Sequence, residues 1–217
     1  MTTTMHTADL LTLMQWLSPA YPVGAFAYSH GLETEISAGR LRSAAALEAW
    51  LSDVLEHGGG AADAVLLTAA YDADEADLET IDAEARAFAG SSERLRETVD
   101  QGAAFAATTR AVWGLDLPDM AYPVAVGRAG QLKGMARQTV CAAYLHGFVA
   151  NLVSAAVRLV PLGQTEGQAV LAGLAPLCEE IAQRAEGKTC DDLVSQAFLS
   201  DIAAMQHEDL DVRIFRT

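Results

Sequence analysis

The chain has 217 residues, 51% of them hydrophobic and 20% charged, and a formal net charge of −15. The hydrophobic content excludes an intrinsically disordered chain, and 14 basic residues against 29 acidic ones exclude a general nucleic-acid binder. Three widely spaced cysteines, an odd number, favour the reducing cytoplasm over a secreted disulfide framework. The amino terminus also lacks the basic and apolar pattern of a signal peptide.

Apolar residues recur at helical spacing along most of the chain. A first stripe runs from Leu47 to Leu55, with Ser43 in the position of a helix N-cap. Further stripes follow at 78–88, 95–113 and 177–185, and the last runs from Val194 to Met205. Thr189 and Asp192 have the spacing of a capping box before that last helix.

The breaks between these stripes contain glycine and proline, and no run alternates with the period of a strand. The sequence therefore predicts an all-α fold, a single-domain helical bundle of about eight to ten helices with no significant sheet. We assign residues 1–206 to this domain. Residues 207–217 carry mixed charge without a helical stripe, so they are expected to form an exposed C-terminal tail for partner docking.

The segment between Arg137 and Arg158 contains no charged residue and is long enough to cross a bilayer. Its apolar residues are mostly small alanines, and polar side chains such as Asn151 interrupt it. A helix buried in the middle of a bundle therefore explains it better than a membrane span.

Charge is distributed unevenly along the chain. Residues 72–100 include ten acidic and three basic side chains, whereas residues 120–165 include no acidic side chain. The acid-free stretch is expected to be buried in the core or between subunits. Within it, Gly127, Gly130 and Gly134 allow either a close helix–helix or subunit contact or ordinary internal packing.

No pattern in the sequence assembles an active site. Gly187-Lys188-Thr189 resembles the end of a phosphate-binding loop but lacks the earlier glycine and the preceding strand. The five histidines show no metal-ligand spacing, so a metal site is not predicted, with His30 and His207 as weak candidates for transient contact. The residues alone indicate a helical interaction protein, and a helical hydrolase with an acidic cleft is the alternative.

Three separated segments resemble those of a known family. Residues 17–33, LSPAYPVGAFAYSHGLE, are similar to the amino-terminal signature of the urease accessory proteins of the UreF family. Residues 158–164, RLVPLGQ, and the final RIFRT after His207-Glu208 resemble two later elements of that family in the same order. Ala25, Ala27 and His30 depart from the residues common in the signature.

This resemblance implies a cytoplasmic, usually dimeric chaperone that is not an enzyme. Such a protein would bridge a nickel-carrying GTPase, UreG, and a second accessory protein, UreD or UreH, during delivery of nickel to urease apoprotein. No cofactor would be bound tightly: nickel would pass transiently through the complex, and the partner GTPase would bind GTP. Neither nucleic acid nor a membrane is expected as a partner.

Residues in the matched segments are the candidates for partner binding. Proline fixes φ, so Pro22 stiffens a turn that would present Phe26 and Tyr28 at the surface. An arginine can bind a carboxylate through forked hydrogen bonds, which makes Arg158 a further candidate. The tail supplies the rest of the predicted docking residues, which are His207, Arg213, Phe215 and Arg216.

Overall fold

The computed structural model describes residues 6–194, 198–210 and 213–216. Within these ranges the chain forms ten α-helices and two short 3-10 turns, and it contains no β-strand. The helices are α1 (Thr7–Trp16), α2 (Leu32–Ser37), α3 (Ala44–His57), α4 (Gly59–Asp72), α5 (Leu78–Ala87), α6 (Ser92–Trp113), α7 (Tyr122–Leu132), α8 (Arg137–Leu159), α9 (Gln164–Arg184) and α10 (Phe198–His207). The turns are η1 (Ala25–Ala27) and η2 (Cys190–Asp192). The predicted all-α fold is confirmed.

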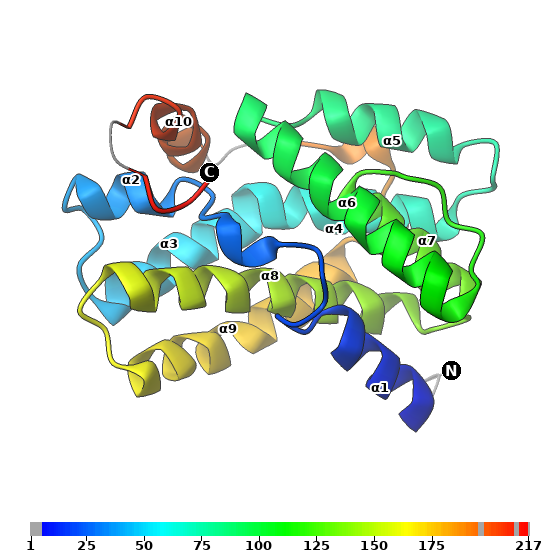
Figure 1. Cartoon of the computed structure of the whole chain (residues 1–217), viewed down its shortest axis with the longest axis horizontal. Helices are drawn as coiled ribbons and strands as arrows, with labels where there is room; N and C mark the ends of the chain where they lie inside the picture. Colours follow the sequence, from blue (N-terminus) through cyan, green and yellow to red (C-terminus); the bar gives the residue numbers. More distant parts are fainter. Residues whose placement is uncertain (1–5, 195–197, 211–212, 217) are drawn as a thin grey trace.

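Helix α8 is the uncharged segment of the sequence, and it lies in the middle of the bundle. It packs against α9, α7, α4, α3 and α2, and Figure 1 shows it running across the molecule beside α9. It is the one helix in the described ranges that is long and apolar enough to cross a membrane, and half of its most apolar window is buried. The packing explains its composition, because small side chains allow several helices to approach one another.

The glycines of α7 divide into two kinds. A Cβ at Gly127 would collide with the backbone carbonyl of Leu67 in α4, and a Cβ at Gly130 would lie 3.0 Å from a methyl of Val140 in α8. Both positions therefore serve close packing inside the chain. Gly134 does not: it follows α7 with a φ of +65° and has open space at its Cβ position, so it takes no part in packing inside the chain, and its role in a subunit contact stays a prediction.

Replacing Gly130 by Glu is expected to lower the free energy of unfolding by several kcal/mol, because the new side chain would place a charge in a crowded, buried contact. Gly59→Glu is the matched control, since nothing lies within 4 Å of a Cβ there and an acidic residue suits the first turn of α4. Thermal melts of the two variants test this. Equal melting temperatures would contradict the packing assignment.

Helix ends follow the predicted caps in part. The Ser43 hydroxyl accepts a hydrogen bond from the backbone N–H of Ala46 and caps α3, as predicted. Asp192 accepts from the backbone N–H of Thr189 at 2.9 Å, but this capping box begins the short turn η2. The described part of the last helix begins at Phe198, Val194 lies outside a helix, and residues 195–197 between them are outside the described ranges.

An aromatic cluster fixes the segment between α1 and η1 to the bundle. Trp16 packs edge-on against Phe105 and Trp113, with ring centroids 5.4 Å and 5.7 Å apart. Tyr21 lies beside the same two rings, and its hydroxyl is 2.8 Å from the Thr109 hydroxyl of α6. The loop that follows is therefore held at its start by aromatic packing.

Candidate partner-binding surface

The C-terminal segment is folded onto its own chain. The backbone N–H groups of Ile214 and Phe215 donate to the two carboxylate oxygens of Glu33, at 2.8 Å and 3.0 Å. The backbone N–H of Arg216 donates to the carbonyl of Ala27 at 2.7 Å. Phe215 is only 4% exposed and belongs to the hydrophobic core cluster. The prediction of an exposed tail is therefore wrong for Phe215. Burial of its apolar ring against the core lowers the free energy of the folded chain.

His207 is also buried, contrary to the predicted exposure of the tail. It ends α10, its side chain is fully inaccessible to solvent, and both of its ring nitrogens face carboxylates. Nε2 lies 3.1 Å from Glu33, and Nδ1 lies 2.8 Å from Glu93 of α6. A buried polar ring needs such partners.

The loop from Pro22 to Tyr28 presents one of its two predicted aromatic residues. Phe26 is 64% exposed, and Pro22 at the start of the loop is also exposed. Tyr28 is buried, which corrects its predicted place at the surface. Burial, the largest cause, raises the pKa of Tyr28, and Arg216 offsets part of this effect through a hydrogen bond to the phenol. Tyr28 thus anchors the loop and the C-terminal segment rather than contacting solvent.

Side chains of α8 hold this loop from the other side. Asn151 donates to the carbonyl of Ala25 at 2.7 Å, and Arg158 donates to the carbonyl of Phe26 at 3.3 Å. The Arg158 guanidinium also lies 4.7 Å from the centre of the Phe215 ring, in the geometry of a cation–π contact. Arg158 therefore joins the loop to the C-terminal segment.

Three segments that are far apart in the sequence meet here. We call the exposed part of this region the docking surface, and it consists of Phe26, Arg158, Arg213, Ile214 and Arg216. Its two apolar side chains, Phe26 and Ile214, are 64% and 70% exposed. Three arginines accompany them in a chain whose net charge is −15. Exposed apolar groups beside cations are typical of protein interfaces.

Sequence reasoning missed the side chains that assemble this surface. No sequence pattern predicts a role for Glu33, Asn151 or Glu93 at this surface. Their partners lie more than a hundred residues away in the sequence, so no local spacing could reveal the contacts. Of residues 158–164, Arg158 reaches the docking surface, whereas Gly163 is the N-cap of α9.

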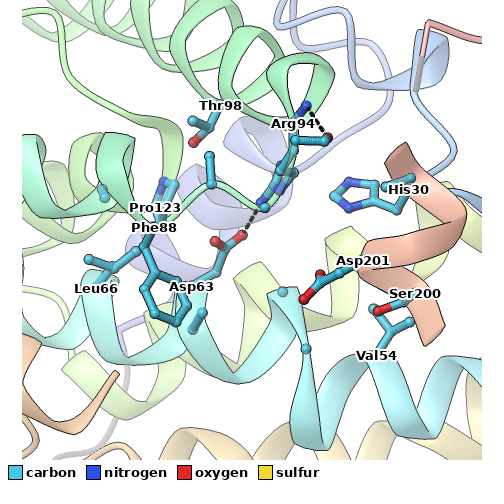
Figure 2. Close-up of a pocket in the computed structure, with 18 residues that line it drawn as sticks. His30, Val54, Asp63, Leu66, Phe88, Arg94, Thr98, Pro123, Ser200 and Asp201 are labelled. Carbon is cyan, nitrogen blue, oxygen red and sulfur yellow. Dashed lines mark hydrogen bonds and ion pairs between the residues drawn. The ribbon is translucent and has the colours of Figure 1, made fainter. Parts of the chain in front are cut away.

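A second group of polar side chains lies beneath this region, between α4, α6 and α8. Arg94 pairs with Asp63 at 2.8 Å and with Glu97 at 3.1 Å, and the Tyr144 hydroxyl donates to Asp63 at 2.6 Å. His30 lies 2.9 Å from Glu97, so this candidate for transient metal contact is engaged with a carboxylate. Figure 2 shows Arg94 reaching Asp63 at the wall of a cavity of about 140 Å³, with Asp201 of α10 opposite.

Two carboxyl groups of these regions, Glu97 and Glu33, have pKa values below the usual range. Burial acts to raise the pKa of Glu97, but His30 and Arg94 outweigh it and lower that pKa. Burial likewise opposes the lowering at Glu33, where His207 and the N–H groups of Ile214 and Phe215 keep the pKa below its usual value. A general acid needs the opposite shift, so these two carboxyls do not suit the hydrolase alternative.

Lowered pKa values make the fold sensitive to acid. A carboxyl whose pKa is lower in the folded chain than in the unfolded chain stabilises the fold at pH values above its ordinary pKa of 4.5. This stabilisation is lost as the pH falls through the lowered pKa of the folded chain. We expect the melting temperature to be steady between about pH 5 and 6 and to fall below about pH 4. Glu33→Gln should reduce this dependence. Melts of both chains between pH 3 and 7 check it, and identical pH profiles would contradict the role given to Glu33.

Groups of His, Cys, Asp and Glu suited to a metal ion are absent from the part of the chain that the structure describes. The glycines of α7 contribute to core packing and not to the docking surface. The polar chemistry of the described residues is concentrated in ion pairs between helices and in the docking surface.

Comparison with known proteins decides the family. The family model for UreF matches residues 41–175. The chain belongs to the UreF family. It is 56% identical over 213 residues to the urease accessory protein UreF of Roseobacter denitrificans, covering 98% of this chain and 96% of that relative.

Other relatives in the UreF family match over similar lengths. The chain is 56% identical over 210 residues to a urease accessory protein UreF of Cereibacter sphaeroides, covering 97% of this chain and 99% of the relative. It is 51% identical over 212 residues to the protein of that name from Jannaschia, covering 98% and 96%. The resemblance read from the three segments is confirmed. These UreF matches cover more of the chain than residues 41–175, the range of the family model.

Proposed function

We propose that the chain is a chaperone and scaffold in urease maturation. In this proposal it bridges the nickel-carrying GTPase UreG and the accessory protein UreD or UreH, and it supports GTP-dependent delivery of nickel into urease apoprotein. The observation that carries the proposal is the meeting of the family's separated segments at one exposed surface. Membership of the UreF family supports the process, and the docking surface supports the mode of action.

The residues of the docking surface indicate which groups a partner must present. Phe26 and Ile214 can enter an apolar pocket, and Arg158, Arg213 and Arg216 can pair with carboxylates at its rim. We assign this surface to UreD or UreH. Asn151 of α8 already donates a hydrogen bond to the loop, and Glu33 already accepts two from the C-terminal segment. Binding a partner therefore costs less conformational entropy than it would if a disordered tail had to fold.

The remaining parts of the proposal follow from the same role. The chain acts as a cytoplasmic homodimer and is not an enzyme. Nickel is cargo that passes through the complex, and GTP is bound and hydrolysed by UreG. A closed cage of His and Cys would retain nickel, which stands high in the affinity series, and would slow its transfer.

Reversing the charge of Arg158 tests the assignment. Arg158→Glu removes the donor to the Phe26 carbonyl and the cation over Phe215, and it places a negative charge opposite the partner's carboxylates. We expect at least a tenfold loss of affinity for UreD or UreH and a matching loss of nickel-dependent urease activation. Circular dichroism spectra should still show a helical fold.

Lys133→Glu is the matched control, because it makes the same change in net charge at an exposed position. Lys133 lies just before α8, whose 23 residues place Arg158 about 30 Å away along the helix axis. Activation should survive this change. If both variants activate urease like the parent chain, the docking assignment fails.

A further inference from the structure

The cluster that holds the C-terminal segment contains one titratable ring between two carboxylates. His207 is fully buried, with Nε2 facing Glu33 of α2 and Nδ1 facing Glu93 of α6. The second oxygen of Glu93 accepts from Arg213 at 2.5 Å. Glu33 holds Ile214 and Phe215 through their backbone N–H groups. Glu33 and Glu93 thus each link His207 of α10 to the C-terminal segment of the docking surface.

The neighbouring groups complete the charge balance. Glu208, next to His207, accepts from the backbone and hydroxyl of Ser92 at the start of α6, so its charge is used at that helix end. Around the ring itself, the charged groups facing it are Glu33 from α2 and Glu93 from α6, with Arg213 behind Glu93. The negative charges of Glu33 and Glu93 are therefore balanced by Arg213 and by any positive charge on the His207 ring.

A doubly protonated ring would satisfy both of these contacts as a hydrogen-bond donor. A neutral imidazole has one N–H and one lone pair, so it can donate to only one of the two carboxylates. The other would then face a lone pair of a ring that is itself inaccessible to solvent, at the cost of a lost hydrogen bond and of repulsion between the lone pair and the carboxylate. With a proton on each nitrogen, both contacts are charge-assisted hydrogen bonds.

We propose that protonated His207 acts as a clasp that keeps residues 213–216 folded onto α2 and α6 and so keeps the docking surface assembled. Loss of one proton from the ring opens the clasp, releases the segment and weakens partner binding. This inference builds on the proposed function, because it describes the regulation of the same surface.

Both limbs of the pH response have a defined direction. As the pH rises, the ring loses a proton and Glu33 or Glu93 loses its donor, so the segment opens. As the pH falls into the range where carboxyls titrate, Glu33 gains a proton and no longer accepts from both backbone N–H groups. The clasp is closed between these limits, and its opening on the alkaline side depends on His207.

Amide hydrogen exchange tests the clasp without any partner. We expect the protection factors of the Ile214 and Phe215 amides in the full chain, corrected for intrinsic exchange, to fall at least tenfold between pH 6 and 9. In His207→Gln, which keeps one donor but cannot titrate, protection should be low already at pH 6 and independent of pH. His57→Gln, at an exposed position in the last turn of α3, is the control and should behave like the parent chain.

Two further measurements keep the test decisive if His207→Gln folds poorly. In the parent chain at pH 6, nitrogen-15 NMR should show two N–H groups on the His207 ring, and a single one contradicts the clasp. Glu93→Gln keeps the histidine and removes one carboxylate, so it should lower the pH at which protection is lost. Protection that is constant between pH 6 and 9 in the parent chain overturns the inference.

Titration of purified UreD or UreH at the same pH values separates the clasp from the proposed function. Affinity that falls together with amide protection supports both. Protection that falls while affinity stays constant supports the clasp and refutes the docking surface. If the affinity for UreD or UreH depends on Arg158 while amide protection does not change with pH, the docking surface is supported and the clasp is refuted.

Discussion

Removing residues 213–217 is expected to weaken binding of UreD or UreH by roughly a hundredfold and to abolish nickel-dependent urease activation. The deletion removes Arg213, Ile214 and Arg216, three of the five residues of the docking surface. It also leaves Phe26 without the neighbouring segment that donates to the Ala27 carbonyl. The deletion therefore removes part of the docking surface and loosens the rest, and both effects weaken partner binding.

The same deletion should lower the melting temperature by several degrees. Phe215 leaves the core cluster, and Glu33 loses two backbone donors while remaining largely buried. A disordered tail would give the opposite result, with binding lost and the melt unchanged. Binding titrations beside thermal melts distinguish the two, and an unchanged melting temperature would contradict the folded segment.

Replacing Arg94 by Ala should cause the largest loss of stability, about 3–5 kcal/mol of the free energy of unfolding. Arg94 is the cation shared by Asp63 and Glu97, both almost fully buried. Without it, two carboxylates stay in the interior with fewer partners, and the cost of burying their charge is no longer offset. Urea unfolding followed by circular dichroism measures the difference.

Arg96→Ala is the control for Arg94, because it removes the same side chain two residues further along α6 at an exposed position. It should change the free energy of unfolding by less than about 0.5 kcal/mol. A loss of similar size in both variants would show that the helix, rather than the buried pairing, is sensitive to the change.

Helical periodicity was sufficient to predict the architecture. The stripe from Leu47 to Leu55 became the buried face of α3, and the serine before it became its cap. The uncharged stretch became α8, because a helix surrounded by other helices needs no polar face. These features depend on residues within one or two turns of each other, which is the range over which a single sequence is informative.

The docking surface could be predicted only in part, because long-range contacts place its residues. Phe26, Arg158, Arg213 and Arg216 were identified through the family's segments, and the structure leaves them exposed. The burial of Phe215 and His207 depends on Glu33, about 180 residues away in the sequence, which no local pattern reveals. A short segment rich in charge looks like a solvated tail unless its partners are known.

Gly134 shows the same limit at shorter range. Its spacing from Gly130 suggested one helix face, but α7 ends at Leu132 and Gly134 takes a left-handed conformation in the turn. Spacing predicts a shared face only within one continuous helix. The boundary of α7 therefore decided the role of this glycine.

The central claim is that Phe26 and Ile214 form an assembled docking surface for UreD or UreH. Calorimetric titration of that partner into Phe26→Asp, Ile214→Asp and Val112→Asp tests it most directly. Val112 is a matched control, since it is 59% exposed and lies near the far end of α6, 20 residues or about 30 Å from the Ser92 end. The account predicts at least a tenfold loss of affinity for the first two variants and none for Val112→Asp. Equal affinity in all three variants and the parent chain would contradict it.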